Sequence, residues 1–433
     1  MQTLIFVIKK MKTILSILIV IFMSSSLVAQ DISGDWKGNI EMNGMQIPII
    51  FHFTKDNAGN LTGKWDSPKQ KAMGLPFSAI DIKEDSIKLD IQMINGFYNG
   101  KLVNKDSISG MWHQGGIELP LNFSRSKGDI HEEKITTVVY PGEKEISITS
   151  GLGTPLYGTL LSKNNQQTIA IIVAGSGPTD RNGNSTMGAP TNEYQMLAHS
   201  LDSQNIATFR YDKYGVAKSL PSGFKESNLV FDNYVKDAEN IFDYLHDTLG
   251  FKNIYFIGHS EGSLIAMLAS EKKPVKGYIS IAGAGRPIDI ILEEQLKKAP
   301  FPDSVKQQIP LIFNQLKKGN IVDNYPESLA SVFRKSVQPY IISWMKYSPE
   351  MEIKKLKCPI LLLQGSCDIQ VQIEDANNLH NANKKSTLEI IPGMSHILKN
   401  AGKDCVDENK TYTDGSMPID QQLVGDIVKF IKN

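Results

Sequence analysis

The chain has 433 residues, of which 41% are hydrophobic, and its 46 basic side chains balance 46 acidic ones. This composition excludes an intrinsically disordered protein, and the lack of a basic surplus argues against nucleic-acid binding. The 34 glycines follow no period, which excludes collagen-like and solenoid folds. The length alone predicts about two to three domains.

The first thirty residues have the pattern of an export signal. Three lysines within the first twelve residues precede an apolar run over 14–23, and Ala29 precedes the expected cleavage site. A membrane-spanning helix would need about 20 apolar residues, so a secretory signal peptide is favoured. We expect residues 1–29 to be removed and the mature protein to be exported, periplasmic or secreted, with no integral membrane segment. Removal leaves 43 basic against 46 acidic side chains, a net charge of −3.

Residues 30–127 have the pattern of a small all-β antiparallel domain. Short runs of alternating apolar and polar residues are separated by turn residues, and no helical period persists. A loose repeat places Trp36, Trp65 and Trp112 each two residues after a glycine. Two interpretations are open: the indoles fill the core of a barrel or sandwich, or they form a platform for sugars or lipids.

A polar segment, residues 128–145, is expected to link this domain to a second one at 146–433. There, apolar strands alternate with amphipathic helices, which is typical of a mostly parallel sheet with helices on both faces, the α/β class. Residues 286–350 interrupt this alternation with helical, proline-broken segments, and we expect them to form a helical lid. After antiparallel strands within 146–161, the expected strands are 168–174, 207–211, 254–257, 277–281, 359–363 and 387–391, and the expected helices are 192–203, 229–248, 260–270, 374–381 and 420–431.

The strongest chemical signal is the pentapeptide Gly258-His259-Ser260-Glu261-Gly262, which lies between an expected strand and an expected helix. A strand–turn–helix around G-x-S-x-G exposes the serine hydroxyl at a helix N-terminus, where developing negative charge is favoured. Ser260 is therefore the predicted nucleophile. His259 directly precedes it and is expected to be structural.

A serine nucleophile needs a base that takes its proton and an acid that orients the base. Asp368 follows the expected strand 359–363 at a glycine turn, and His396 lies in the loop after the expected strand 387–391. Both side chains are thereby expected at the edge of the sheet where the parallel strands end. We predict Asp368 as the acid and His396 as the base.

Two backbone N–H groups are needed to stabilise the oxyanion that such a reaction forms. Glu261 supplies one by its position after the nucleophile. Ser176 is the predicted second donor, because it lies between two glycines in the loop after strand 168–174 and the main chain can approach a substrate there. Asp180 and Arg181 are expected to brace this loop by an internal ion pair.

The G-x-S-x-G turn with Ser260, Asp368 and His396 in that order resembles the α/β-hydrolase superfamily. Residues 174–183 and 209–215 resemble those of bacterial carboxylesterases grouped with serine aminopeptidase-like hydrolases. Many relatives carry a His-Gly pair at the oxyanion loop, where this chain has Ala174-Gly175. The all-β region resembles the lipocalin-like modules found ahead of some exported hydrolases.

The resemblance implies a serine carboxylesterase that cleaves small to medium acyl esters through an acyl-enzyme on Ser260. An aminopeptidase or amidase with the same three residues is the alternative, and it would need an acidic group in the lid, for which Glu293, Glu294 and Glu327 are candidates. A third possibility is a binding protein whose β-domain carries the function.

The role of Trp344 and the pairing of the three cysteines are open at this point. Trp344, at the end of the lid, either lines an acyl pocket or packs within the lid. Cys367 abuts the predicted acid and Cys405 follows the predicted base, so a disulfide between them would tie the two loops together, with Cys358 as the free thiol. No metal-ligand spacing, P-loop or dinucleotide motif occurs in the sequence, so neither metal nor cofactor is expected, and the expected partner is a small-molecule ester.

Overall fold

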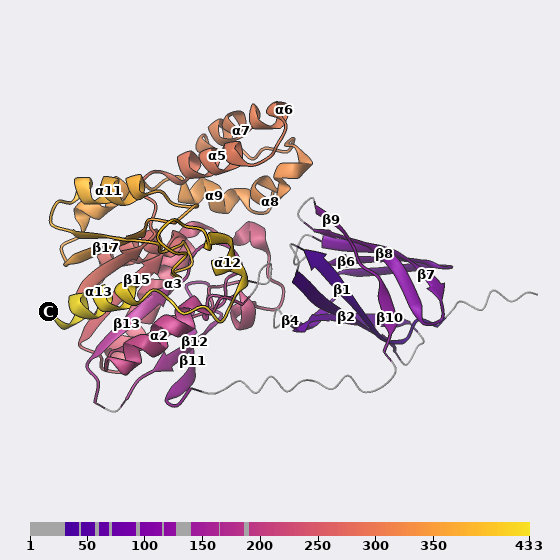
Figure 1. The fold of residues 1–433 in the computed structure, drawn as a ribbon, viewed down its shortest axis with the longest axis horizontal. Helices are drawn as coiled ribbons and strands as arrows, with labels where there is room; N and C mark the ends of the chain where they lie inside the picture. The colour runs from indigo at the N-terminus through magenta and orange to yellow at the C-terminus, as the bar shows by residue number, and fades with distance from the viewer. Residues whose placement is uncertain are drawn as a thin grey trace, which may run out of the picture. The chain divides into compact units, whose positions relative to one another are not determined.

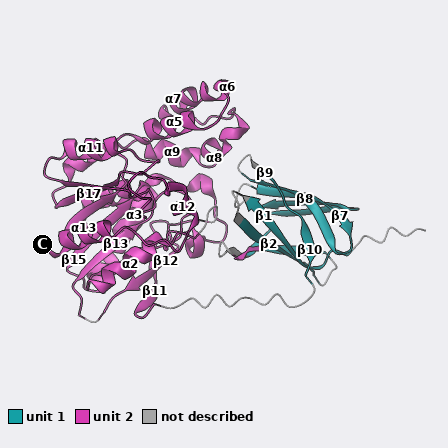
Figure 2. Cartoon of the chain, viewed as in Figure 1, with its two compact units in different colours: residues 1–65, 74–114, 118–130 teal, residues 66–73, 115–117, 131–433 magenta. Residues whose placement is uncertain are grey.

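The computed structural model describes residues 31–42, 45–56, 60–68, 72–91, 96–114, 117–126, 140–163, 165–185 and 190–433. The expected signal peptide and the part of the expected linker before residue 140 lie outside these described residues. The chain divides into two compact units (Figure 2): unit 1 comprises 1–65, 74–114 and 118–130, and unit 2 comprises 66–73, 115–117 and 131–433. Within the described ranges, no helix is both long and apolar enough to span a bilayer.

The N-terminal sheet has ten strands in the order β4-β3-β2-β1-β10-β8-β7-β6-β5, with β9 beside β8. Neighbouring strands such as β1 and β2, or β7 and β8, are antiparallel, and the sheet curls around its own apolar core (Figure 1). The strands are β1 (Gly34–Met42), β2 (Met45–Lys55), β3 (Leu61–Ser67), β4 (Ala72–Pro76), β5 (Ala79–Lys83), β6 (Ser86–Ile91), β7 (Gly96–Asn104), β8 (Ser107–Gln114), β9 (Ile117–Pro120) and β10 (Phe123–Arg125).

The three tryptophans of the loose repeat lie inside this core. Trp36, Trp65 and Trp112 are each at most 3% exposed, and the indole N–H of Trp36 donates to the Ile32 carbonyl at 2.8 Å. A ligand platform needs exposed ring faces, so this burial favours the packing interpretation.

Unit 2 contains an eight-stranded sheet in the order β11-β12-β14-β13-β15-β16-β17-β18 (Figure 1). β12 is antiparallel to both β11 and β14, and every later pair is parallel. The strands are β11 (Glu143–Thr149), β12 (Pro155–Leu161), β13 (Thr168–Val173), β14 (Ala207–Tyr211), β15 (Asn253–His259), β16 (Gly277–Ile281), β17 (Ile360–Gly365) and β18 (Thr387–Ile391). The expected linker 128–145 is therefore too long, because residues 143–145 pair with β12 as part of β11.

Helices cover both faces of this sheet, as predicted. Alternate residues of β13 point to opposite faces: Ile169, Ile171 and Val173 join a core with α3, α4 and α11, whereas Ala170 and Ile172 join a core with α2 and α13. The covering helices are α2 (Glu193–Ser203), α3 (Phe231–Asp243), α4 (Glu261–Lys272), α11 (Ile373–Ala382) and α13 (Gln421–Lys432), and a short helix, α12 (Glu408–Thr413), precedes α13 in the chain. Among the expected helices, 229–248 differs most from the structure, because the α-helix ends at Asp243 and continues as a π-helical turn, Tyr244–Thr248.

The predicted insertion lies between β16 and β17 and is helical. Its elements are α5 (Ile288–Lys298), α6 (Asp303–Lys306), α7 (Ile309–Lys317), α8 (Ala330–Phe333), α9 (Gln338–Trp344) and α10 (Pro349–Glu352). Phe313, Leu316, Leu329 and Phe333 form an apolar core of its own. The insertion is therefore a small folded layer that can present a fixed surface to the site.

Candidate active site

Ser260 lies on the sharp turn between β15 and α4. Its backbone is left-handed, with φ 53°, and its N–H donates to the Ile281 carbonyl at 2.9 Å. The flanking glycines are required by close approach: a Cβ on Gly258 would lie 2.3 Å from the Gly262 carbonyl oxygen, and one on Gly262 would lie 2.2 Å from that of Val173. This packing holds the partly exposed Ser260 side chain at the end of the strand.

His396 and Asp368 meet at the same edge of the sheet. His396 Nδ1 donates to Asp368 Oδ2 at 2.8 Å, and Asp368 Oδ1 accepts the backbone N–H groups of Gln370 (2.8 Å) and Val371 (2.9 Å). Burial raises the pKa of Asp368, but the charge and hydrogen bond of His396 and these two N–H groups outweigh it and leave that pKa below its usual value. The carboxylate is therefore ionised and fixes the orientation of the imidazole.

His259 is held by hydrogen bonds on both sides and takes no part at the hydroxyl of Ser260. Its Nε2 donates to the His396 carbonyl at 2.8 Å, so its Nδ1 accepts from the Tyr194 hydroxyl at 2.7 Å. Burial lowers the pKa of His259 to about 3, which keeps the ring neutral. Tyr194 Oη in turn accepts the Gly175 N–H at 3.0 Å, so one hydrogen-bonded chain connects the loop after β13 to the loop that carries His396.

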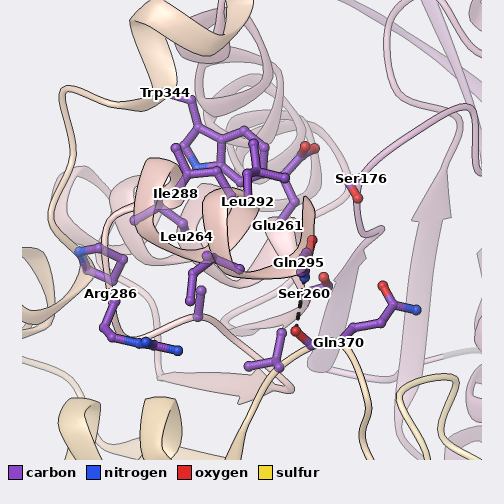
Figure 3. A pocket seen from close by; sticks show the side chains of 14 residues that line it. Ser176, Ser260, Glu261, Leu264, Arg286, Ile288, Leu292, Gln295, Trp344 and Gln370 are labelled. Atoms are coloured by element: carbon purple, nitrogen blue, oxygen red, sulfur yellow. Dashed lines mark hydrogen bonds between the residues drawn. The ribbon is translucent and has the colours of Figure 1, made fainter. Parts of the chain in front are cut away.

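The two predicted oxyanion donors lie beside Ser260. Ser176 and Glu261 line the same pocket as Ser260 (Figure 3), and a Cβ on Gly175 would lie only 3.2 Å from the Ser260 Cβ. The Gly175 N–H is used by Tyr194, whereas the Ser176 N–H has no hydrogen-bond acceptor among the described residues. The Ser176 N–H is therefore free to bind an oxygen atom on a substrate.

An apolar pocket opens from Ser260 toward the insertion. Its apolar lining consists of Leu264, Ala284, Ile288, Ile291, Leu292, Trp344, Pro349 and Val371 (Figure 3). Trp344 lines this pocket, and it also packs against Tyr340 of the insertion, with ring centroids 5.9 Å apart, and stacks on Phe231 of α3 at 5.3 Å. The rim of the pocket is tied together by Gln295, whose Nε2 donates to the Gln370 carbonyl at 2.9 Å.

A second pocket lies on the His396 side of Ser260. It is lined by Thr179, Thr191, Glu193 and Tyr412, and it also contacts Ser176 and His259. Burial raises the pKa of Glu193 to about 8, so this carboxyl is protonated at neutral pH. The protonated carboxyl of Glu193 and the neighbouring hydroxyls can donate or accept hydrogen bonds without carrying a charge.

Two contacts near the oxyanion loop were not predicted correctly from the sequence. Arg181 does not pair with Asp180; its Nη2 donates to Asp212 Oδ2 at 2.7 Å and its backbone N–H to Asp212 Oδ1 at 2.8 Å. Lys213, for which the sequence predicted no contact, donates from its buried Nζ to the Gly175 carbonyl and to Glu261. The segment after β14 therefore anchors the loop after β13.

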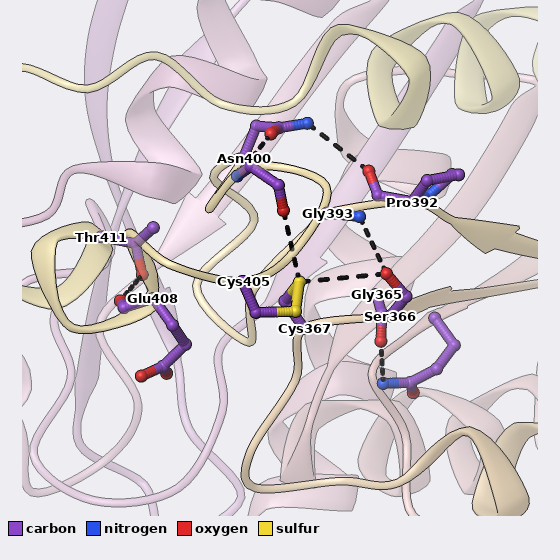
Figure 4. The surroundings of a disulfide bond; sticks show 11 residues. Gly365, Ser366, Cys367, Pro392, Gly393, Asn400, Cys405, Glu408 and Thr411 are labelled. Atoms are coloured by element: carbon purple, nitrogen blue, oxygen red, sulfur yellow. Dashed lines mark hydrogen bonds between the residues drawn. A yellow bond between two sulfur atoms is a disulfide. The ribbon is translucent and has the colours of Figure 1, made fainter.

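A disulfide between Cys367 and Cys405 links the acid loop to the segment after His396 (Figure 4). The Cα atoms are 5.4 Å apart, and Cys358 is free and half-buried. Hydrogen bonds support the same junction: the Cys367 N–H donates to the Met394 carbonyl at 3.0 Å, and Ser366 Oγ accepts the Gly393 N–H at 2.8 Å. The loops that carry Asp368 and His396 are thus joined covalently and by hydrogen bonds.

The strand order, the serine turn after β15, and the acid and histidine after β17 and β18 define an α/β-hydrolase. The chain has the α/β-hydrolase fold, and an all-β antiparallel domain precedes the hydrolase domain in the sequence. The sequence profile of the family Hydrolase_4, described as serine aminopeptidase S33, matches residues 186–336. That range includes Ser260 and stops before Asp368 and His396.

Esterase EstD of Thermotoga maritima is 25% identical over 243 residues, which are 54% of this chain and 53% of that protein. The chain thus spans about half the length of this curated relative. Among solved structures, Est1E of Butyrivibrio proteoclasticus with bound ferulic acid has a TM-score of 0.45 and 21% identity, covering 66% of this chain and 96% of its own. The Pyrococcus furiosus esterase Pf2001 has a TM-score of 0.45 and 15% identity, and the match covers 67% of this chain and 90% of the esterase.

Proposed function

We propose that this protein is an exported serine carboxylesterase. The observation that carries the proposal is the His396–Asp368 hydrogen bond at the same sheet edge as Ser260, which lies on its strand-to-helix turn. A serine on such a turn, an imidazole and a buried ionised carboxylate are the three groups that acyl transfer through a serine requires. The similarity to an esterase of Thermotoga maritima supports the same reaction class.

The reaction follows from these positions. Ser260 Oγ attacks the ester carbonyl carbon as His396 takes the hydroxyl proton, and the carbonyl oxygen becomes an oxyanion bound by the N–H groups of Ser176 and Glu261. Collapse of this intermediate breaks the bond to the alcohol, which leaves with the proton from His396. Water, deprotonated by His396, then attacks the acyl carbon, the bond from that carbon to Ser260 Oγ breaks as His396 returns the proton to Oγ, and the acid leaves. Asp368 keeps the imidazole in the required tautomer and stabilises its protonated form.

The two pockets beside Ser260 support a placement for each half of the ester. The leaving alcohol must lie beside the base that protonates it, so it occupies the second pocket, which His396 lines. The acyl chain then occupies the pocket between α4 and the insertion, whose wall includes the apolar side chains of Leu264 and Leu292 and the ring of Trp344. This assignment supports a small to medium apolar acyl group.

None of the three candidate carboxylates for an aminopeptidase is among the residues that line the pocket between α4 and the insertion. Glu294 pairs with Arg286 at 2.7 Å, Glu293 pairs with Lys297 at 2.5 Å, and Glu327 is exposed at the start of a 3₁₀ turn. The cation of Arg286 lines the apolar pocket, and the carboxylate of Glu261 in the same lining is already paired with Lys213 at 2.7 Å. These contacts favour an ester over a substrate with a free ammonium group.

The test compares esters with amides in the same preparation. p-Nitrophenyl acetate and butyrate are assayed beside aminoacyl-p-nitroanilides, with Ser260→Ala as the control for background hydrolysis. We expect ester turnover that the Ser260→Ala variant lacks. Anilide turnover without ester turnover would establish the aminopeptidase instead, and no turnover of either by the unchanged protein would refute both. For export, N-terminal sequencing of the protein from the periplasm or medium should start at Gln30.

A further inference from the structure

Lys213 is a buried cation next to the site with no place in the mechanism above. Its side chain is 1% exposed, and it follows β14 at the base of the loop that Asp212 ties to Arg181. Nζ has three N–H donors, and each has a partner: the Gly175 carbonyl at 2.6 Å, Glu261 Oε1 at 2.7 Å, and the face of the Tyr234 ring, whose centroid is 4.8 Å away. A buried ammonium with all three donors directed to partners is held in one position.

The two oxygen partners of Lys213 belong to the 175–176 peptide group and to Glu261, which carry the two proposed oxyanion donors. The Gly175 carbonyl and the Ser176 N–H are parts of one planar trans peptide and point in opposite directions. When Lys213 fixes the carbonyl oxygen on one side, it therefore fixes the direction of the Ser176 N–H on the other. A cation at the carbonyl oxygen also polarises the peptide and makes its N–H a stronger donor.

The second partner, Glu261, carries the other N–H at the start of α4. Its carboxylate is 3% exposed and is held by the same Nζ. One ammonium thus joins the loop after β13, through the Gly175 carbonyl, to the start of α4, through the Glu261 carboxylate. The hydrogen bond from Gly175 N–H to Tyr194 holds the remaining side of the loop.

We propose that Lys213 is a positioning residue for the oxyanion hole: it acts through the 175–176 peptide and through Glu261, and it does not touch the substrate. The proposal rests on the function proposed above, because it assigns a role within that site. It predicts that the loss of Lys213 reduces kcat without raising KM, because the oxyanion exists only after attack by Ser260.

The single variant Lys213→Met leaves the Glu261 carboxylate buried and unpaired, and it can fail to fold for that reason alone. The informative variant is therefore Lys213→Met with Glu261→Met, which removes both buried charges and keeps an apolar interior. If the pair serves stability only, this double variant regains the kcat of the unchanged protein. If Lys213 positions the 175–176 peptide, the kcat of the double variant stays below that of the unchanged protein by a factor on the order of 10², and KM does not change.

A matched control removes another buried ion pair of the same sheet. Arg210 Nη2, three residues earlier on β14, donates to Glu143 Oε1 at 2.6 Å, and its side chain is 2% exposed. The double variant Arg210→Met with Glu143→Met should lose stability but keep its kcat, because this pair does not contact the 175–176 peptide.

A fluorophosphonate probe separates this proposal from the choice of substrate. Ser260 Oγ forms a bond to phosphorus, fluoride leaves, the hydroxyl proton passes to His396, and the phosphoryl oxygen occupies the oxyanion site. We expect the folded double variant, verified by circular dichroism, to label on the order of 10²-fold more slowly than the unchanged protein. Normal labelling and kcat in that variant would overturn the role of Lys213. Lys213-dependent labelling without ester turnover would refute the carboxylesterase proposal and retain this one, and no labelling of the unchanged protein would refute both.

Discussion

Breaking the Cys367–Cys405 disulfide should destabilise the hydrolase domain by an amount that follows from its loop. The two cysteines are 38 residues apart, and the chain-entropy relation for a loop of that length gives about 4 kcal/mol at 25 °C. Reduction of this disulfide should change kcat much less than it changes the free energy of unfolding. The backbone hydrogen bonds from Ser366 to Ile391 and from Cys367 to Met394, each 3.0 Å, still join the two loops after reduction.

Pulse proteolysis in urea measures this effect, because fragment masses separate the hydrolase domain from the β-domain. The oxidised protein, the reduced protein and the Cys367→Ala, Cys405→Ala double variant are compared, with Cys358→Ala as the matched control. Reduction and the double substitution should lower the urea midpoint of the hydrolase domain equally, and Cys358→Ala should leave the response to reductant intact. An equal midpoint with and without reductant would refute the reasoning, as would alkylation of all three cysteines in the unreduced, unfolded protein.

Three further predictions concern the site and its support. Asp368→Asn keeps the shape of the side chain but removes the charge that His396 needs, so kcat for p-nitrophenyl butyrate should fall at least about 10³-fold; a loss below about tenfold would exclude the role. Because burial raises the pKa of Glu193 from 4.5 to about 8, its contribution to stability is full below pH 4.5 and is lost as pH rises through 8; Glu193→Gln should remove that loss from the curve of Tm against pH, and an unchanged curve would contradict the burial argument. Asp420 accepts two backbone N–H groups at the start of α13, at 2.8 and 3.2 Å, so Asp420→Ala should cost about 1 kcal/mol in urea unfolding, without change in kcat.

The sequence predicts the sheet and the position of Ser260 well because both are encoded locally. Apolar strand runs and the glycines around Ser260 act on their immediate neighbours, and the six strands from β13 to β18 begin and end within two residues of the expected positions. The positions of Asp368 and His396 could also be predicted, because each residue lies in the loop after a strand. The parallel sheet then brings their loops to one edge.

The contacts that the sequence does not predict are made between segments distant in the chain. Arg181 has an acidic neighbour at Asp180, which suggested a local pair, yet its partner is Asp212, 31 residues away. Lys213 stands in a motif that resembles related hydrolases, but nothing in its spacing reveals that it meets Gly175 and Glu261. Only the folded structure determines which buried charged side chain contacts which peptide group.

The insertion between β16 and β17 separates two properties of the protein along the chain. The groups that we propose as nucleophile, acid, base and oxyanion donors lie at 176, 260–261, 368 and 396, whereas much of the apolar pocket wall comes from 288–349. Substitutions within the insertion can therefore change which acyl groups fit while the reacting groups keep their contacts. Chemistry and selectivity are encoded in different stretches, so this fold can acquire new substrates by exchanging one helical segment.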